Sequence, residues 1–154
     1  MIIGYLDNKG KNISVEEQKS IIENYAKIHN FMINIYLKSD KISSVLSYVC
    51  PKNNLIIVAN AFSIGVSLSD IKDNVSLLND NQISVHLVEE AQCINTGNSA
   101  KEFIKTLDIA NKIRSSIVSI ASKVGIKRRL AQGLKTGRPI GTKNQYRQEE
   151  LGVK

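Results

Sequence analysis

Apolar residues follow two alternating patterns along the chain: short runs, and longer stretches in which they recur in steps of three or four. The short runs are typical of buried strands, and they lie at Met1–Leu6, Phe31–Leu37, Leu55–Val58 and Gln82–Val88. The stepped stretches predict amphipathic helices. One opens at Ser14, where Glu17 completes a capping box, and another opens at Ser67, a favoured N-cap residue.

A third and much longer helix is predicted from Ser99 to about Leu130. At 1.5 Å per residue it would be about 48 Å long. That is more than a small domain can cover, so part of it is expected to project or to pair with another chain. Apolar and small residues recur on one face of this helix and form the predicted dimer interface. They are Phe103, Leu107, Ala110, Ile113, Ile117, Ala121 and Val124.

The order of these elements predicts an α/β fold. Right-handed crossovers between the strands give a mostly parallel sheet of four or five strands with helices on both faces. We expect the α/β domain over residues 1–98, the long helix over 99–132 and an extended basic arm over 133–154. A short helix at Val45–Cys50 and a loop at Gln92–Asn98 complete the prediction.

A binding or catalytic site is expected beyond the carboxyl ends of the strands, as in other open parallel sheets. Those ends are the loops after Leu6, Leu37 and Val58. No glycine-rich phosphate loop occurs there, so no nucleotide cofactor is expected.

The chain of 154 residues has a net charge of +7, and the whole excess lies near its C-terminal end. Residues 1–122 hold 12 basic and 12 acidic residues, whereas residues 123–154 hold nine basic residues and two acidic ones. A neutral domain followed by a cationic segment indicates a polyanionic partner, most often nucleic acid. An anionic membrane surface and a merely solubilising tail are the alternatives.

The cysteines and histidines argue against a metal site. Cys50, Cys93, His29 and His86 are the only ones, and their spacing does not fit a zinc cluster. Unpaired cysteines without a signal peptide favour a reducing compartment, and the longest apolar runs are far shorter than a membrane span. We therefore expect a cytoplasmic protein with no metal, cofactor or membrane segment.

Several short motifs occur in one order along the chain. MIIGY at its start is followed by VEEQ, by LIIV and by Gly65, and the long helix ends in GLKTGRPIGTKN. In this register the chain resembles the serine recombinases, the resolvase and invertase family, and within it the DNA invertases. The resemblance implies a catalytic domain with a parallel sheet, a long dimerisation helix and an arm along DNA. In that family a serine hydroxyl attacks a phosphodiester, and arginines stabilise the charge on the reacting phosphate.

This chain departs from the family pattern at the catalytic positions. After the first strand, Tyr-x-Arg-Val-Ser is replaced by Tyr5-Leu6-Asp7-Asn8-Lys9, which puts a lysine at the position of the nucleophile. After the third strand, Arg-Leu-Gly-Arg is replaced by Ser63-Ile64-Gly65-Val66. On the long helix, Ser-Glu-Arg-Thr is replaced by Ser119-Ile120-Ala121-Ser122. The degenerate positions are Asp7, Lys9, Ser63, Val66 and Ala121.

Other serines of nearby loops do not restore the predicted chemistry. Ser39, Ser43, Ser44, Ser63 and Ser67 lie in suitable loops. A hydroxyl without a base or a cationic clamp is, however, a poor nucleophile. The sequence therefore predicts a recombinase-like domain without catalytic activity.

The basic arm is the part of the resemblance that is retained. Its core, Gly137-Arg138-Pro139, suits a narrow minor groove, because glycine admits close approach, arginine meets the negative potential of A·T-rich sequence and proline keeps the path extended. Basic residues of the preceding helix would meet phosphates. The predicted DNA-binding residues are Lys123, Lys127, Arg128, Arg129, Lys135, Gly137, Arg138, Pro139 and Lys143. Only ten residues follow Asn144, too few for the helix-turn-helix domain usual in the family.

Three hypotheses follow. The first is a non-catalytic DNA-binding protein, paired with itself or with a related active recombinase, that serves as a regulator, an architectural factor or an accessory factor of recombination or transcription. The second is a protein-interaction module that uses the fold for assembly without binding DNA. The third, an active invertase or resolvase with unusual residues, is the least favoured.

Overall fold

The structure is a computed structural model that describes residues 1–9, 13–49 and 54–134. Its strands are β1 (Ile2–Asp7), β2 (Ile35–Ser39), β3 (Asn54–Val58), β4 (Ile83–Leu87) and β5 (Gln92–Ile94). Its α-helices are α1 (Val15–Ile28), α2 (Leu68–Asp80) and α3 (Asn98–Ala131), and two short 3₁₀ helices are η1 (Ile42–Ser47) and η2 (Ala61–Ser63). Contacts within the chain divide it into two compact units, Met1–Ile113 and Arg114–Lys154.

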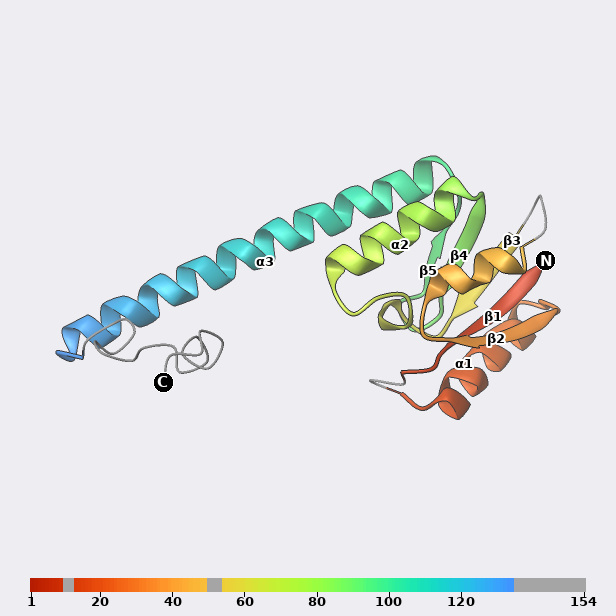
Figure 1. The fold of residues 1–154 in the computed structure, drawn as a ribbon, viewed down its shortest axis with the longest axis horizontal. Coiled ribbons are helices and arrows are strands. Elements are labelled where there is room, and N and C mark those ends of the chain that lie inside the picture. The colour runs from red at the N-terminus through yellow and green to blue at the C-terminus, as the bar shows by residue number, and fades with distance from the viewer. Residues whose placement is uncertain (10–12, 50–53, 135–154) are drawn as a thin grey trace, which may run out of the picture. The chain divides into compact units, whose positions relative to one another are not determined.

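The first unit is built on one sheet of five strands in the order β2-β1-β3-β4-β5. The first four strands are parallel, and β5 runs antiparallel to β4. Figure 1 shows α1 on one side of this sheet and α2 on the other. The predicted mostly parallel α/β sheet with helices on both faces is therefore confirmed.

Alternating side chains of the inner strands supply two apolar layers. On one face Ile3, Tyr5 and Ile56 belong to the larger core, where they pack with η1, α2 and the first turns of α3. On the other face Leu6 and Ile57 pack against Ile22 of α1. Because β1 and β3 are buried on both faces, their sequences read as continuous apolar runs, and this is why both were predictable.

Each α-helix ends in the same way. Asn30, Gln82 and Gly133 have positive φ angles of 55°, 57° and 69°. After α1 the N–H of Phe31 donates to the carbonyl of Ala26, and after α3 the N–H of Leu134 donates to the carbonyl of Arg129. These left-handed residues stop the helices and satisfy carbonyls of the last turn, so that α3 ends at Ala131 within one residue of the predicted end.

Three local predictions were wrong. β2 begins at Ile35 rather than Phe31. Its partner strand β1 begins at Ile2, and the carbonyl of Ile2 accepts from the N–H of Asn34, so residues before Asn34 have no β1 residue to pair with. The helix expected at Val45–Cys50 is the 3₁₀ helix Ile42–Ser47. The segment expected to be a loop at Gln92–Asn98 contains β5, which the turn at Ala91 (φ 48°) folds back onto β4.

Gly65 occupies a close approach between the end of η2 and the first turn of α2. A Cβ atom at this position would lie 2.8 Å from the Cβ of Asp70 and 2.8 Å from the backbone nitrogen of Ile71. Both neighbours are fixed by the helix, so the site has no room for a side chain.

We predict that Gly65→Ala lowers the free energy of unfolding by about 1–3 kcal/mol, because the added methyl group would overlap the first turn of α2. Urea denaturation followed by circular dichroism measures the change. The matched control is Gly125→Ala, since a Cβ there meets nothing within 4 Å and alanine stabilises a helix interior by roughly 0.5–1 kcal/mol. Equal stability of Gly65→Ala and the wild type would contradict the packing argument.

Candidate functional site

Two adjoining hollows of about 380 Å³ and about 280 Å³ lie beyond the carboxyl ends of β1, β2 and β3. They share Asp7, Phe62, Ser63 and Val66 as lining residues, and we call them together the cleft. This is where a parallel sheet places its binding sites. The surface is thus hollowed at the position where the sequence predicts a site.

Gln18 of α1 holds the chain that leaves β1. Its side chain is 1% exposed, and its Oε1 accepts from the N–H of Asp7 at 2.8 Å. Its Nε2 donates to the carbonyls of Asp7 at 3.1 Å and of Ile13 at 3.2 Å. One buried amide therefore satisfies three backbone groups of Asp7 and Ile13, and it fixes where Asp7 enters the cleft.

A second buried amide, Asn60, organises the chain that leaves β3. Its Oδ1 accepts from the N–H of Ser63 at 3.1 Å and from the hydroxyl of Ser63 at 3.2 Å. Its Nδ2 donates to Glu89 at 2.8 Å. The neighbouring Glu90 accepts from the N–H of Ala61 at 2.9 Å. Two carboxylates that follow β4 thus support η2, a connection that sequence analysis did not detect.

Most of the candidate serines of this region cap backbone elements. The hydroxyl of Ser63 is held by Asn60, and that of Ser67 accepts from the N–H of Asp70 at 3.1 Å. Ser44 donates to the carbonyl of Lys41 at 2.8 Å, and Ser39 accepts from the N–H of Lys41 at 3.3 Å. Ser43 lines the second hollow. These four hydroxyls therefore make local hydrogen bonds that stabilise turns and helix starts.

Among the described residues, carboxylates outnumber ammonium groups in the lining of the cleft, and no guanidinium group lines it. The carboxylates are Asp7, Asp40, Asp70 and Asp73, and the ammonium groups are Lys9 and Lys41. All five arginines of the chain follow Ile113 in the sequence, so the compact unit 1–113 has none. The surplus of carboxylates gives the cleft a negative potential, which repels a phosphate.

Tyr5 contributes a neutral hydroxyl beneath the cleft. It is buried, and its hydroxyl donates to the carbonyl of Ser39 at 2.9 Å. Burial raises the pKa of Tyr5 far above its usual range, and the charges of Asp7 and Asp40 raise it further. Tyr5 therefore remains a protonated donor that links β1 to the end of β2.

The degenerate positions named from the sequence are brought together in part. Asp7 ends β1, and its Oδ1 accepts from the N–H of Lys9 at 3.4 Å. Ser63 and Val66 lie across the cleft mouth, Ser63 buried and Val66 59% exposed. Ala121 lies on α3 in the second unit.

The predicted dimer interface on α3 divides into two parts. Phe103 and Leu107 pack against the larger core of the compact unit, and Asp108 nearby binds Lys72 of α2 at 2.7 Å. Side chains further along the helix are exposed, among them Ile113, Ile117 and Val124. Ile120, which the sequence analysis did not select, is exposed to 62%.

These exposed residues form a heptad pattern. Ile113, Ile117, Ile120 and Val124 follow one another in steps of four, three and four, the spacing of a helix-pairing seam. We call these four residues the apolar stripe.

The predicted DNA-binding residues are described only in part. Lys123, Lys127, Arg128 and Arg129 are exposed near the end of α3. Lys135, Gly137, Arg138, Pro139 and Lys143 lie outside the described residues.

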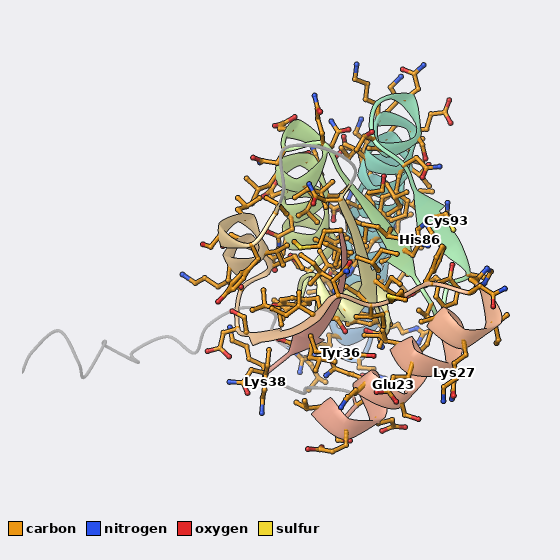
Figure 2. The ribbon with its side chains drawn as sticks, turned by 90° about the vertical axis from the view of Figure 1, so that its right-hand side faces the viewer. Glu23, Lys27, Tyr36, Lys38, His86 and Cys93 are labelled. Atoms are coloured by element: carbon orange, nitrogen blue, oxygen red, sulfur yellow. The ribbon has the colours of Figure 1, made fainter. Side chains whose placement is uncertain are left out.

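A cluster of polar and aromatic side chains that the sequence did not reveal lies on the α1 face of the sheet. The hydroxyl of Tyr25 lies 3.1 Å from Nδ1 of His86 and 3.9 Å from Sγ of Cys93. The rings of Phe31 and His86 are 5.8 Å apart, and Figure 2 shows His86 and Cys93 next to one another on β4 and β5. Burial lowers the pKa of His86, and the nearby His29 lowers it further.

Among the described residues, no group of three or more histidine, cysteine or acidic side chains could hold a metal ion. Within the same residues, no helix is both long enough and apolar enough to cross a bilayer.

Comparison with solved structures identifies the fold as that of serine-recombinase catalytic domains. The N-terminal catalytic domain of TP901-1 integrase matches with a TM-score of 0.57 and 14% identity, over 75% of this chain and 97% of that chain. A resolvase family site-specific recombinase from Streptococcus pneumoniae matches with a TM-score of 0.54 and 14% identity, over 84% of this chain and 97% of that chain. No protein-family model matches the sequence, and no curated protein matches it significantly. The fold implied by the sequence motifs is confirmed.

The lowered pKa of His86 predicts a pH dependence of stability. The folded state favours the neutral ring, so its stabilising effect is complete above the ordinary histidine pKa of about 6.5 and is lost as the pH falls below it. We expect the free energy of unfolding, measured with urea, to decrease between pH 7.5 and pH 5.5. In His86→Gln, which keeps an acceptor for Tyr25, the decrease should be smaller. An unchanged pH profile in this variant would exclude His86 as its source.

Proposed function

We propose that this protein is a non-catalytic DNA-binding protein with a recombinase fold, which pairs through α3 and acts as a regulator, architectural factor or accessory factor of recombination or transcription. The observation that carries the proposal is the distribution of charge. The compact unit 1–113 has no arginine, whereas residues 123–154 hold the whole net charge of +7. All guanidinium groups of the chain therefore lie outside the unit that holds the cleft.

The lack of catalysis is argued from the chemistry of phosphoryl transfer. A reacting phosphodiester needs an activated nucleophile and cationic groups that stabilise its developing charge. The cleft instead presents Asp7 and Asp40, and the hydroxyl of Ser63 is held by Asn60. In the described lining, two lysines face four carboxylates, so a DNA phosphate is disfavoured there.

DNA contact is assigned to the end of α3 and the segment after it. Lys123, Lys127, Arg128 and Arg129 are exposed and can neutralise phosphates, which gives a salt-sensitive affinity independent of sequence. Arg138, between Gly137 and Pro139, is assigned to an A·T-rich minor groove.

Pairing is assigned to the apolar stripe. Four branched side chains that are each at least 43% exposed are more than scattered surface residues, because they share one seam of a continuous helix. A second copy of α3 is a partner with a complementary seam. A related active recombinase with an equivalent helix would serve in the same way.

We predict that the protein binds A·T-rich duplexes with a steep dependence on salt. Arg138→Ala should weaken binding to an A·T-rich duplex more than to a G·C-rich duplex. Lys127→Ala should weaken both equally and reduce the slope of log K against log[salt] by about 1. Fluorescence anisotropy at several salt concentrations measures both effects.

The matched control is Lys19→Ala, which removes an exposed lysine of α1 in the compact unit and should leave both affinities unchanged. Failure of the full chain to bind either duplex at low salt would refute the proposed function.

A second candidate function is a protein-interaction module that does not bind DNA, and the exposed apolar stripe favours it. Replacement of Lys127, Arg128, Arg129 and Arg138 by glutamate separates the two. Loss of DNA binding with association intact supports the first proposal. If the wild type associates but never binds DNA, the second is correct.

We also predict that no covalent protein–DNA adduct forms. Supercoiled DNA carrying A·T-rich tracts is incubated with the protein, denatured with detergent and analysed for linked protein by electrophoresis. An active serine recombinase on its own site is the positive control. An adduct with this chain would restore the hypothesis of an active recombinase.

A further inference from the structure

The cleft combines an acidic lining with an apolar mouth. Phe62 is 57% exposed and Val66 is 59% exposed, although both flank the buried Ser63 and Ile64. Ile13 lines the first hollow beside them. Two large exposed side chains at the entrance of a hollow of about 380 Å³ offer apolar surface that a ligand could cover.

The charges around this apolar mouth define the chemistry of the ligand. Asp40 and Asp73 are exposed, and Asp7 and Asp70 are partly exposed. Among the described lining residues, these four carboxylates outnumber the two ammonium groups, those of Lys9 and Lys41. Asp40 already accepts from Asn8 at 3.0 Å, but a carboxylate can accept several hydrogen bonds. The cleft therefore suits a peptide that carries both basic and apolar side chains.

We propose that the cleft binds residues 134–143 of a second copy of this chain. That segment, LKTGRPIGTK, contains three basic residues and no acidic residue, together with Leu134, Pro139 and Ile140. Its charge is opposite to that of the cleft, and its apolar residues match Phe62 and Val66. A proline-containing segment also loses less conformational freedom on binding.

The choice of a second copy rests on the pairing proposed above, which raises the effective concentration of the segment. The match of charge and apolar surface does not depend on that pairing or on DNA binding. Because Arg138 is also the residue assigned to the minor groove, cleft and DNA compete for one segment. Binding to DNA would then release the cleft.

The test uses the full chain with its own segment neutralised by Lys135→Gln, Arg138→Gln and Lys143→Gln. A fluorescent peptide of residues 134–143 is titrated with this protein, and anisotropy reports binding. We expect saturable binding that weakens as salt is raised and that is lost when the peptide carries the same three glutamines.

Two cleft variants of that protein test the two halves of the argument. Phe62→Ser with Val66→Ser removes the apolar mouth, and Asp40→Asn with Asp73→Asn removes charge while amide oxygens remain as acceptors. Each pair should weaken binding at least about tenfold. The matched controls are Ile28→Ser with Met32→Ser, both exposed, and Asp80→Asn, which should leave the affinity unchanged. Circular dichroism establishes that every variant is folded.

The source of the segment is tested by mixing two chains. The first chain has the neutralised segment, an intact cleft and a methyl-labelled Val66. The second chain has the natural segment and a cleft altered by Phe62→Ser and Val66→Ser. A shift of the Val66 methyl resonance on mixing supports binding between copies, and an excess of A·T-rich duplex should reverse it. Peptide binding that is equal in cleft variants and controls would overturn the site. Peptide binding without a shift on mixing would overturn the assignment to a second copy.

These outcomes are distinct from those that test the proposed function. DNA binding is measured with the natural chain and does not require an intact cleft. Peptide binding is measured on a chain whose segment has been neutralised.

Discussion

Burial of the sheet on both faces is the constraint on which the rest of the compact unit depends. Ile3 and Ile56 point into one apolar layer, whereas Leu6 and Ile57 point into the other. Each layer requires a helical cover, and parallel strands require crossovers that supply it. The same geometry brings the carboxyl ends of β1, β2 and β3 to one edge. The cleft is therefore a consequence of topology, and the buried amides of Gln18 and Asn60 give it a defined shape.

Much of this architecture could be predicted from the sequence because its signals are local. The capping serines Ser14 and Ser67 were placed correctly. The apolar repeat of three or four residues continues along most of α3, so this helix could be identified from the sequence. The start of β2 could not be predicted, since it depends on where β1 begins. The strand β5 was missed because Gln92 and Cys93 are exposed and its three residues are too few to show a period.

The candidate site was predictable in position but not in detail. Its location follows from the general behaviour of parallel sheets, and Asp7 was recognised as a residue of it. The bonds from Asn60 to Ser63 and Glu89, and from Tyr25 to His86, join residues that meet only in the folded chain. No spacing in the sequence reports such contacts. The lack of guanidinium groups in the cleft, by contrast, follows from the sequence alone, since no arginine occurs before residue 114.

The two edges of the sheet have a consequence for how copies of this protein can assemble. β5 is only three residues long, and β2 is an edge strand of five residues that carries the exposed Lys38. Short edges and an outward-pointing lysine discourage the addition of a strand from another molecule. Growth of the sheet from one chain into the next is therefore disfavoured, which guards the protein against the open-ended strand pairing that leads to fibres. Under the proposed pairing, ordered association would use α3 instead.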